Sequence, residues 1–442
     1  MTGHVARFPG GFLWGAATSA HQVEGDNRAN DWWRFEQRPG VIAHGDTSGE
    51  ACRHRLRFDE DFALAEADGH GAHRLSLEWS RIEPECSRID AAAVAHYHAV
   101  FASLARRKLK PVVTLWHFTL PAWIADRGGF EDRGTLDRFD DFVRFCAREY
   151  GAEVDWWCTV NEPEVYAFRA YSEGRWPPAK RDDSAALAVI ANLLEAHARA
   201  AAILRAEDRT DADGDGHATR IGFAKHWVVL EPSRWWFPPD ALRTRLEHAV
   251  FNAAVTEAPR TGRIALSIPG ARAVKRTVNG LAGSCDWMGL NYYTRWKVRM
   301  FAPDPHVASP GTELTDLGWE NHPRGIEVAA GALARTGVPV LVTENGVADA
   351  TDRLRPRALV ETLLHLSRAI EGGVPVLGYL HWSLLDNFEW AEGYRGRFGL
   401  YAVDFTRPDR PRTRRRSAEV FARVARANAI DPALAAEVGL AL

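Results

Sequence analysis

Eight short apolar segments, each typical of a buried β-strand, alternate along the chain with helix-like segments. Their centres are rich in Val, Leu, Ile and aromatic residues, as expected for strands buried on both faces of a parallel sheet. The strand-like segments span residues 12–18, 73–79, 111–117, 154–162, 220–227, 285–293, 339–345 and 375–383. The helix-like segments span residues 54–68, 90–107, 136–150, 184–206, 240–257, 323–336, 356–371 and 416–428.

This alternation predicts an α/β fold, a single (β/α)₈ TIM barrel formed by one domain over residues 1–442. The alternative is an open doubly wound sheet, which usually has fewer strands and a Gly-rich first turn. Neither GxGxxG nor GxxxxGKS/T occurs in the chain. Long connections near residues 19–53, 163–183 and 294–322 follow three of the predicted strands. In a barrel such loops lie at the C-terminal face of the strands, where active sites form.

The charge balance limits the kinds of binding partner that we expect, and the cysteines indicate the cellular compartment. The 55 basic and 58 acidic residues give a formal charge of −3, so we expect no nucleic-acid partner and no membrane partner. No apolar run of about 18–20 residues and no signal-peptide pattern is present. The five cysteines include no CxxC pair, which favours reduced thiols and a cytoplasmic location over disulfides or zinc. A homo-oligomer remains open.

Two of the predicted strands end in a glutamate. In VLVTENG, Glu344 stands at the end of one predicted strand. In WWCTVNEP, Glu162 stands just before Pro163, which cannot continue the hydrogen bonding of a strand. Both side chains are therefore predicted at the C-terminal face of the barrel, where they can share one pocket although they are far apart in sequence.

Two facing carboxylates can hydrolyse a glycosidic bond. One stays ionised and attacks the anomeric carbon, while the other is protonated and gives its proton to the leaving oxygen. A separation of about 5–5.5 Å leads to retention of configuration through a covalent intermediate. The alternative is that each glutamate forms a structural ion pair, but two such strand ends, each beside an asparagine, favour the catalytic interpretation.

Six motifs carry a resemblance to a known family. They are FLWGAATSAHQVEG (12–25), TLWHFTLP (114–121), TVNEP (159–163), GLNYY (289–293), VTENG (342–346) and HWSLLDNFEW (381–390). The chain resembles glycoside hydrolase family one, the retaining β-glucosidases and β-glycosidases, from about Phe8 to about Val424. TVNEP and TENG together, in this order, are a highly specific signal.

The resemblance implies roles for the residues around the two glutamates. Glu344 would be the nucleophile and Glu162 the acid/base, and Asn161 would hold the sugar 2-hydroxyl. Arg74 and Tyr293 would flank Glu344 and keep it ionised, with Asn291 as a further supporting residue. Some relatives that cleave thioglucosides have Gln at the acid/base position, so Glu162 favours an O-glycosidase.

The resemblance also implies a binding site for the glycone, the sugar that is transferred. The residues that would contact the substrate are Gln22, His117, Glu389 and Trp390, with Trp382 under the ring and Trp319 on the leaving-group side. Relatives that act on 6-phosphorylated sugars carry a Ser in place of Glu389, and a carboxylate there would repel a phosphate. The chain departs from many members at Phe118-Thr119, where they have Trp-Asp, which leaves the preference among sugars open.

We therefore predict a retaining β-glycosidase that releases terminal β-D-glucosyl residues, with β-galactosyl or β-fucosyl as further substrates, and with no cofactor and no metal. The alternatives are a transglycosylating enzyme and a non-catalytic sugar-binding relative. DADGDG (211–216) begins like a calcium loop, but Gly222 stands at the twelfth position, where such a loop needs Glu, so we expect a solvated turn. The basic run at 407–416 is predicted to be a solvated strap over the barrel.

Overall fold

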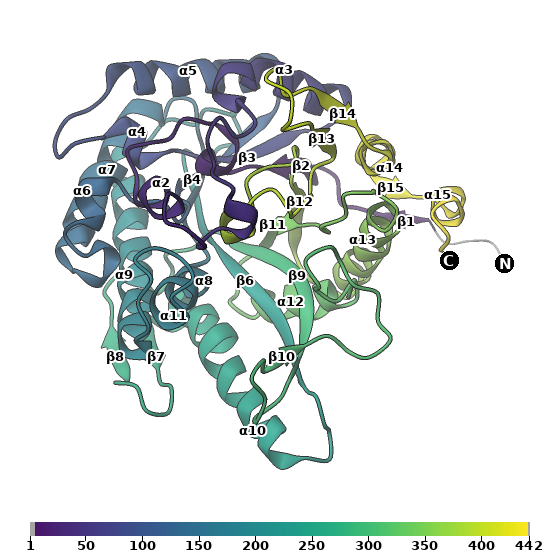
Figure 1. Cartoon of the computed structure of the whole chain (residues 1–442). Helices are drawn as coiled ribbons and strands as arrows, with labels where there is room; N and C mark the ends of the chain where they lie inside the picture. The colour runs from purple at the N-terminus through teal and green to yellow at the C-terminus, as the bar shows by residue number, and fades with distance from the viewer. Residues whose placement is uncertain (1–4, 441–442) are drawn as a thin grey trace.

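The computed structural model describes residues 5–440, and its centre is a closed barrel of parallel strands with helices around it (Figure 1). Around the barrel the strands are β2 (Leu13–Ala17), β3 (Ala72–Ser76), β4 (Lys110–Trp116), β5 (Trp156–Asn161), β6 (Arg220–Pro232), β9 (Met288–Val298), β11 (Val340–Asn345) and β12 (Val376–Trp382). β12 pairs with β2 and β6 pairs with β9, which closes the sheet. The predicted barrel is confirmed, and each predicted strand overlaps one of these eight.

The predicted helices are present on the outside of the barrel. Seven correspond to one helix each, with a kink at Arg57 in the first: α3 (His54–Ala67), α5 (Ala91–Arg106), α7 (Gly134–Tyr150), α9 (Asp183–Glu207), α12 (Gly325–Ala334), α13 (Arg355–Glu371) and α14 (Arg416–Ala427). The segment predicted as one helix over 240–257 is instead α10 (Pro238–Glu247), the π-helical η4 (His248–Ala254) and α11 (Val255–Thr261). The apolar periodicity of this segment did not reveal the change in helical winding.

Short elements fill the connections. They are β1 (Ala6–Arg7), α1 (Ala20–Val23), α2 (Asp31–Glu36), η1 (Ala43–Gly45), α4 (Trp79–Ile82), α6 (Ala122–Ala125), η2 (Gly129–Glu131), α8 (Pro163–Ala167), η3 (Phe168–Ser172), β7 (Arg263–Leu266), β8 (Val274–Thr277), β10 (His306–Val307), η5 (Trp390–Glu392), β13 (Tyr401–Val403), β14 (Arg412–Arg414), β15 (Ala429–Ile430) and α15 (Pro432–Glu437). β1 pairs with β15, which joins the two ends of the described chain.

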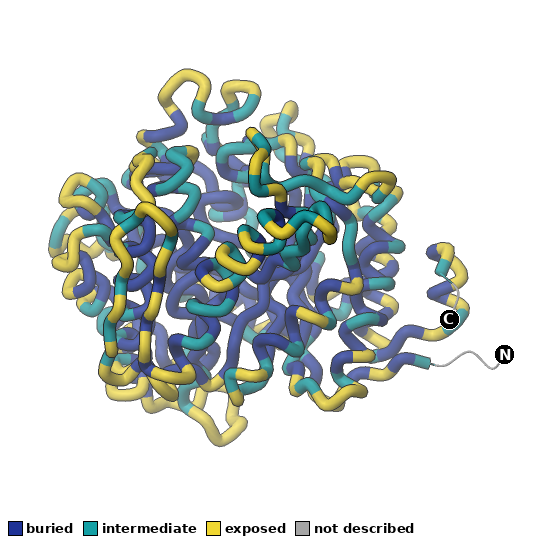
Figure 2. The backbone as a smooth tube through the Cα atoms, turned by 90° about the horizontal axis from the view of Figure 1, so that it is seen from below, coloured by how far each residue is buried: buried dark blue, intermediate teal, exposed yellow. Residues whose placement is uncertain are grey.

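The core runs through the barrel and between the barrel and its helices. Figure 2 shows the buried backbone at the centre of the molecule and the exposed backbone on the outer loops. Within residues 5–440, α9 is the one helix long and apolar enough to cross a membrane. Its apolar stretch is 72% buried in the fold, so these side chains serve as packing between the barrel and α7.

β6 and β9 continue beyond the ends that the sequence predicted. Their pairing extends from Ala224 opposite Gly289 to Pro232 opposite Val298. The added part is half-exposed, so it lacks the buried apolar pattern that marks the other strands. An ion pair between Lys297 and Glu231, with 2.6 Å between Nζ and Oε2, links the two strands there.

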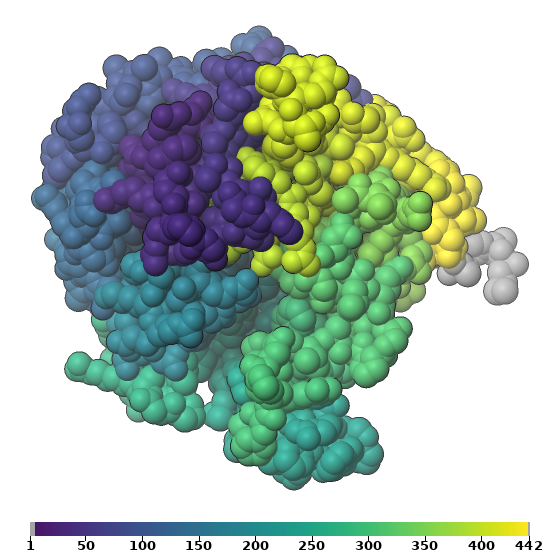
Figure 3. Space-filling view, viewed as in Figure 1, coloured from purple at the N-terminus to yellow at the C-terminus, as the bar shows by residue number. Residues whose placement is uncertain are grey.

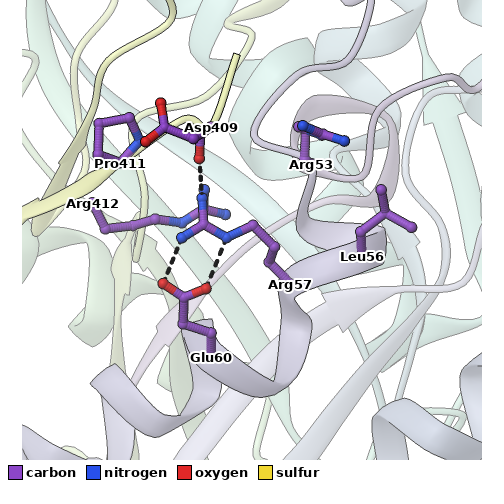
Figure 4. A pocket seen from close by; sticks show the side chains of 7 residues that line it. All are labelled: Arg53, Leu56, Arg57, Glu60, Asp409, Pro411 and Arg412. Atoms are coloured by element: carbon purple, nitrogen blue, oxygen red, sulfur yellow. Dashed lines mark hydrogen bonds and ion pairs between the residues drawn. The ribbon is translucent and has the colours of Figure 1, made fainter. Parts of the chain in front are cut away.

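The basic run near the C-terminus lies over the barrel, as predicted. β14 pairs with β13, and Arg412 binds the buried Asp61 on α3 with 2.7 Å between Nε and Oδ1. Beside this contact, α3 and the segment 409–412 enclose a surface hollow of about 500 Å³, in which Arg57 pairs with Glu60 (Figure 4). The Arg412 side chain is only 2% exposed, whereas Thr413 and Arg414 of the same strand are exposed, so the strap is solvated except at the Arg412 side chain.

The DADGDG segment forms an exposed turn, as predicted. The Asp211 carboxylate accepts hydrogen bonds from the N–H groups of Gly214 and Gly216, both at 2.8 Å. Asp213 lies 2.5 Å from the Lys110 ammonium and within 4.8 Å of the carboxylate oxygens of Asp155 and Asp211. These carboxylates thus act as acceptors within the turn and toward Lys110.

The long loops after the strands cover one end of the barrel. Figure 3 shows the N-terminal loop, in purple, beside the segment near residue 390. Tyr394 joins the two: its O–H donates to the Ser48 carbonyl at 2.7 Å, and its N–H donates to Asp46 at 2.9 Å. This end of the barrel holds the C-terminal ends of β5 and β11, and with them the two glutamates.

Candidate active site

Glu344 lies near the end of β11 and is 4% exposed. The Nη1 group of Arg74, a fully buried residue on β3, donates to Oε1 of Glu344, and the Tyr293 O–H donates to Oε2 at 2.6 Å. A guanidinium and a phenol on separate oxygens favour the ionised carboxylate, which explains how a buried strand can end in a charge.

Glu162 follows the last residue of β5 and is 6% exposed. Its backbone adopts the left-handed region, with φ of 44°, and Pro163 then begins α8. The Glu162 N–H donates to the Ala224 carbonyl on β6 at 2.8 Å. Only the surrounding structure can hold a non-glycine residue in this conformation, which occurs often at functional sites.

A chain of hydrogen bonds connects the two glutamates. Arg74 donates through Nη2 to Oδ1 of Asn161 at 2.7 Å, and Asn291 donates through Nδ2 to the same oxygen at 3.2 Å. Asn291 also donates to Oε1 of Glu162 at 2.7 Å. Glu344 and Glu162 are therefore joined through Arg74, Asn161 and Asn291, and the predicted pair lies in one buried site.

The same network fixes the proton positions on His117. Because Arg74 can only donate, the Asn161 oxygen faces Arg74, and its amide nitrogen faces Nε2 of His117 at 3.2 Å. Burial, with the charge of Arg74, holds the pKa of His117 well below its usual value, so the ring is neutral. Nε2 then accepts from Asn161, and Nδ1, which has no hydrogen-bond partner among the described residues, carries the free N–H. His117 is thus equipped to donate to a sugar hydroxyl.

The Asn291 side chain contacts a different glutamate from the one that the resemblance implied. The resemblance implied support of Glu344, but the Asn291 side chain donates to Glu162 and Asn161 and accepts from Thr343 at 2.6 Å. Asn291 and Tyr293 are two residues apart on β9 and point to the same face, and Tyr293 is the one that reaches Glu344. In the structure the Asn291 side chain therefore contacts Glu162, and not Glu344 as the resemblance implied.

The two carboxyl groups influence each other's proton affinity. Burial raises the pKa of Glu344, Arg74 opposes this effect, and the charge of Glu162 raises it further. Burial also raises the pKa of Glu162, but the charge and hydrogen bond of His226 and the Asn291 amide lower it by more. Among the groups that lower the pKa of Glu162, His226 has the largest effect, and for Glu344 it is Arg74.

Aromatic side chains form one wall of the site. Trp382 and Trp390 each lie nearly parallel to the His117 ring, at centroid distances of 6.2 Å. Phe118, where many relatives have Trp, packs 5.3 Å from Trp390 and 4.9 Å from Trp176. Trp382, expected under the sugar ring, and Trp390, expected to contact the sugar hydroxyl groups, thus lie beside His117, and Phe118 contributes packing there.

The remaining predicted residues lie nearby. Trp319 packs edge-on against Tyr293 at 5.7 Å, beside the phenol that binds Glu344. The Gln22 amide donates to Asn387 at 3.0 Å and to the Phe388 carbonyl at 2.9 Å. Both hydrogens of this amide are therefore used within the protein. Its oxygen already accepts from the Ser19 hydroxyl at 2.6 Å, which leaves one lone pair for a sugar hydroxyl.

Glu389 is a carboxyl without a charged partner. Its Oε2 is buried with no hydrogen bond among the described residues, and Trp382 hydrogen-bonds to the side chain. Burial, with the charges of Glu344 and Glu162, raises the pKa of Glu389 to about 8. Glu389 is charged only above about pH 8, so it would repel a sugar phosphate only above that pH.

The raised pKa predicts an effect on stability. Because the folded state holds the Glu389 proton more tightly than the unfolded chain, wild-type stability falls as pH rises from about 4.5 to about 8. Glu389→Gln lacks this loss, so we expect its melting temperature to exceed that of the wild type increasingly across that range. Thermal scans at several pH values measure the difference, with Glu392→Gln as the control. A constant difference between the two proteins at all pH values would contradict the pKa assigned to Glu389.

His226 contacts Glu162, and the sequence did not predict this contact. It lies on β6, and its Nδ1 is 3.0 Å from Oε1 of Glu162. The strand RIGFAKHW gave no motif for this residue, and a lone histidine in an apolar strand is usually packing. The signal that could have found it is the strand end itself, since barrel active sites draw on residues at these ends.

Comparisons with known proteins identify the family of the chain. Residues 4–430 match the model of glycosyl hydrolase family 1. Beta-glucosidase A of Thermotoga maritima is 34% identical over 91% of this chain and 94% of its own, and a beta-galactosidase of Pyrococcus woesei is 30% identical over 98% and 99%. The beta-glycosidase structure from Pyrococcus horikoshii superposes with a TM-score of 0.89 at 33% identity, covering 99% of both chains. The chain therefore belongs to glycosyl hydrolase family 1 and is a glycoside hydrolase.

Proposed function

We propose that the protein is a retaining β-glycosidase that removes terminal β-D-glucosyl residues through a covalent glycosyl-enzyme. The observation that carries this proposal is the pair of buried glutamates, Glu162 and Glu344, joined by one hydrogen-bond network but supplied with different donors. Glu344 has a permanent cation beside it, as an ionised nucleophile needs. Glu162 has an amide and an imidazole beside it, and in these surroundings the carboxyl group can both release and take up a proton.

In the first step a carboxylate oxygen of Glu344 attacks the anomeric carbon as the bond to the leaving oxygen breaks. Glu162 gives its proton to that oxygen, so the aglycone departs as a neutral alcohol. The positive charge that develops on the ring is stabilised by the Glu344 carboxylate. Asn161 is placed to hold the 2-hydroxyl, a contact that strengthens in the transition state.

In the second step water replaces the sugar on Glu344. Glu162, now ionised, takes one proton from the water as its oxygen attacks the anomeric carbon, and the ester bond to Glu344 breaks. The free sugar leaves with its original configuration, and both carboxyl groups return to their starting states. Loss of the Glu344 charge in the intermediate is the reason that one residue can serve first as acid and then as base.

Several observations support glucose as the first glycone and galactose as a further one, and we extend the proposal to fucose. Relatives of this chain are named beta-glucosidase and beta-galactosidase. Structures similar to it, of the Thermotoga maritima enzyme, hold deoxynojirimycin or galacto-hydroximolactam. For the sugar hydroxyl groups, His117 offers a free donor, Gln22 offers the second lone pair of its oxygen, and Glu389 offers a carboxyl. We also propose that residues 1–442 form one catalytic domain and that the enzyme works in the cytoplasm, where its five free thiols are stable.

A panel of aryl β-glycosides that differ only in the sugar tests this function. We expect the highest kcat/KM with the β-glucoside, lower values with the β-galactoside and β-fucoside, and no turnover of the α-glucoside. The relative values report how well each hydroxyl is matched in the transition state. Absence of turnover with all β-glycosides would favour the non-catalytic alternative, and dominance of transfer products in the presence of an alcohol would favour the transglycosylase.

A further inference from the structure

The position of His226 follows from the pairing of β6 with β9. In this parallel register His226 lies opposite Asn291, so both side chains point to the same side at the same level of the barrel. Both reach the same atom: Asn291 Nδ2 lies 2.7 Å and His226 Nδ1 lies 3.0 Å from Oε1 of Glu162. Glu162 is therefore held through one oxygen by two neighbouring strands.

The backbone of His226 is also fixed. Its N–H donates to Oε1 of Glu164 at 2.9 Å, and the same carboxylate oxygen pairs with the Lys225 ammonium at 2.8 Å. Both side chains of this pair are fully buried. The His226 ring stacks on Tyr293 at 5.8 Å and meets the edge of Phe251, on η4, at 5.9 Å. The ring is therefore held in place between aromatic neighbours, with Nδ1 directed at Glu162.

These contacts decide which oxygen of Glu162 can carry a proton. Asn291 donates to Oε1 through its amide, whose own oxygen accepts from Thr343. An oxygen that already accepts one hydrogen bond from an amide and a second from an imidazole N–H is a poor site for a proton. We propose that His226 is the positioning residue of Glu162: its Nδ1–H binds Oε1 and keeps the transferable proton on Oε2. This assignment rests on the proposed role of Glu162 as the acid/base.

Other charged groups face this pair and stay the same when His226 is changed. They are Arg74 on β3, Glu164 on α8, Lys225 on β6, Tyr293 on β9, Glu344 on β11 and Glu389 after β12. A change in the pH profile of a His226 variant therefore reports the loss of its own hydrogen bond.

The test compares His226→Phe, which keeps a ring of similar shape, with His226→Gln, which keeps a neutral donor. Loss of a donor to the carboxylate raises the pKa of Glu162, so in His226→Phe the alkaline limb of kcat/KM moves up by about one pH unit. We also expect kcat/KM to fall about tenfold or more for an alkyl β-glucoside and much less for a dinitrophenyl β-glucoside. His226→Gln returns both readouts toward the wild type. The control is His306→Phe, which removes a His–Glu pair of 2.8 Å on β10 and leaves both readouts unchanged.

An alkaline limb that stays in place or moves down in His226→Phe would overturn the proposal, because loss of a donor that binds Oε1 must raise the pKa of Glu162. Equal losses on both substrates, without recovery in His226→Gln, would also overturn it, since a packing role predicts that pattern. Failure of the proposed function is a separate result: the wild-type enzyme would then show no turnover of either β-glucoside.

Discussion

Glu344→Ala abolishes turnover of an aryl β-glucoside, with a loss of kcat/KM of about five orders of magnitude. The variant has no atom that can form the glycosyl ester, and the leaving group cannot compensate because the missing step is the attack itself. The change also leaves the buried Arg74 guanidinium without its partner, which costs about 3–5 kcal/mol of stability. Steady-state kinetics and thermal unfolding measure the two effects separately.

The variant Glu344→Gln shows whether activity is lost because the nucleophile is missing or because the protein no longer folds. The amide oxygen still accepts hydrogen bonds at this position, so this variant is expected to be folded yet inactive. Asp61→Asn is the control, because Asp61 is also a fully buried carboxylate bound to an arginine, Arg412, but lies under the C-terminal strap. We expect it to lose stability and keep kcat/KM. Wild-type activity in folded Glu344→Gln would contradict the role of Glu344.

Glu162→Ala gives a loss that depends on the leaving group, from about 10²-fold to 10⁴-fold in kcat/KM for an alkyl β-glucoside. A dinitrophenolate leaves without a proton, so formation of the glycosyl-enzyme from that substrate is much less affected. The second step still needs a base, so the intermediate accumulates and kcat falls for both substrates. A pre-steady-state burst of dinitrophenol measures this accumulation.

The outcome that contradicts this role is an equal loss of kcat/KM for both substrates. A small added nucleophile such as azide provides a further check, because it needs no base and can reach the anomeric carbon in the space left by the Glu162 side chain. Azide should raise the turnover of the dinitrophenyl substrate in Glu162→Ala and yield the β-glycosyl azide. It should leave the wild type unaffected.

Features encoded within one segment could be predicted from the sequence. The buried run VLVT and the turn after it located Glu344 at a strand end, and Pro163 located the end of β5 beside Glu162. The barrel followed from the regular alternation of such segments with amphipathic helices. The motifs then placed Arg74, Tyr293 and His117 around the pair, and the structure brings all of them together.

Features that depend on pairing between distant segments could not be predicted. The partner of Asn291 is set by the register of β9 against β11 and β6, and a one-residue difference would turn its side chain to the other face. His226 meets Glu162 for the same reason, through a register that no local pattern shows. The half-exposed extensions of β6 and β9 are held by cross-strand contacts such as the ion pair of Lys297 with Glu231. The sequence of either strand alone therefore does not indicate where that strand ends.

The most direct test of the account is to trap the intermediate. A 2-deoxy-2-fluoro β-glucoside with an activated leaving group slows both steps, and the second more than the first, so the sugar stays on the enzyme. Mass spectrometry of the intact protein and its peptides then shows how many sugars are bound and to which residue. The account predicts one fluoroglucosyl ester, on Glu344. An ester on another residue, or no ester together with a product of inverted configuration from the normal substrate, would contradict it.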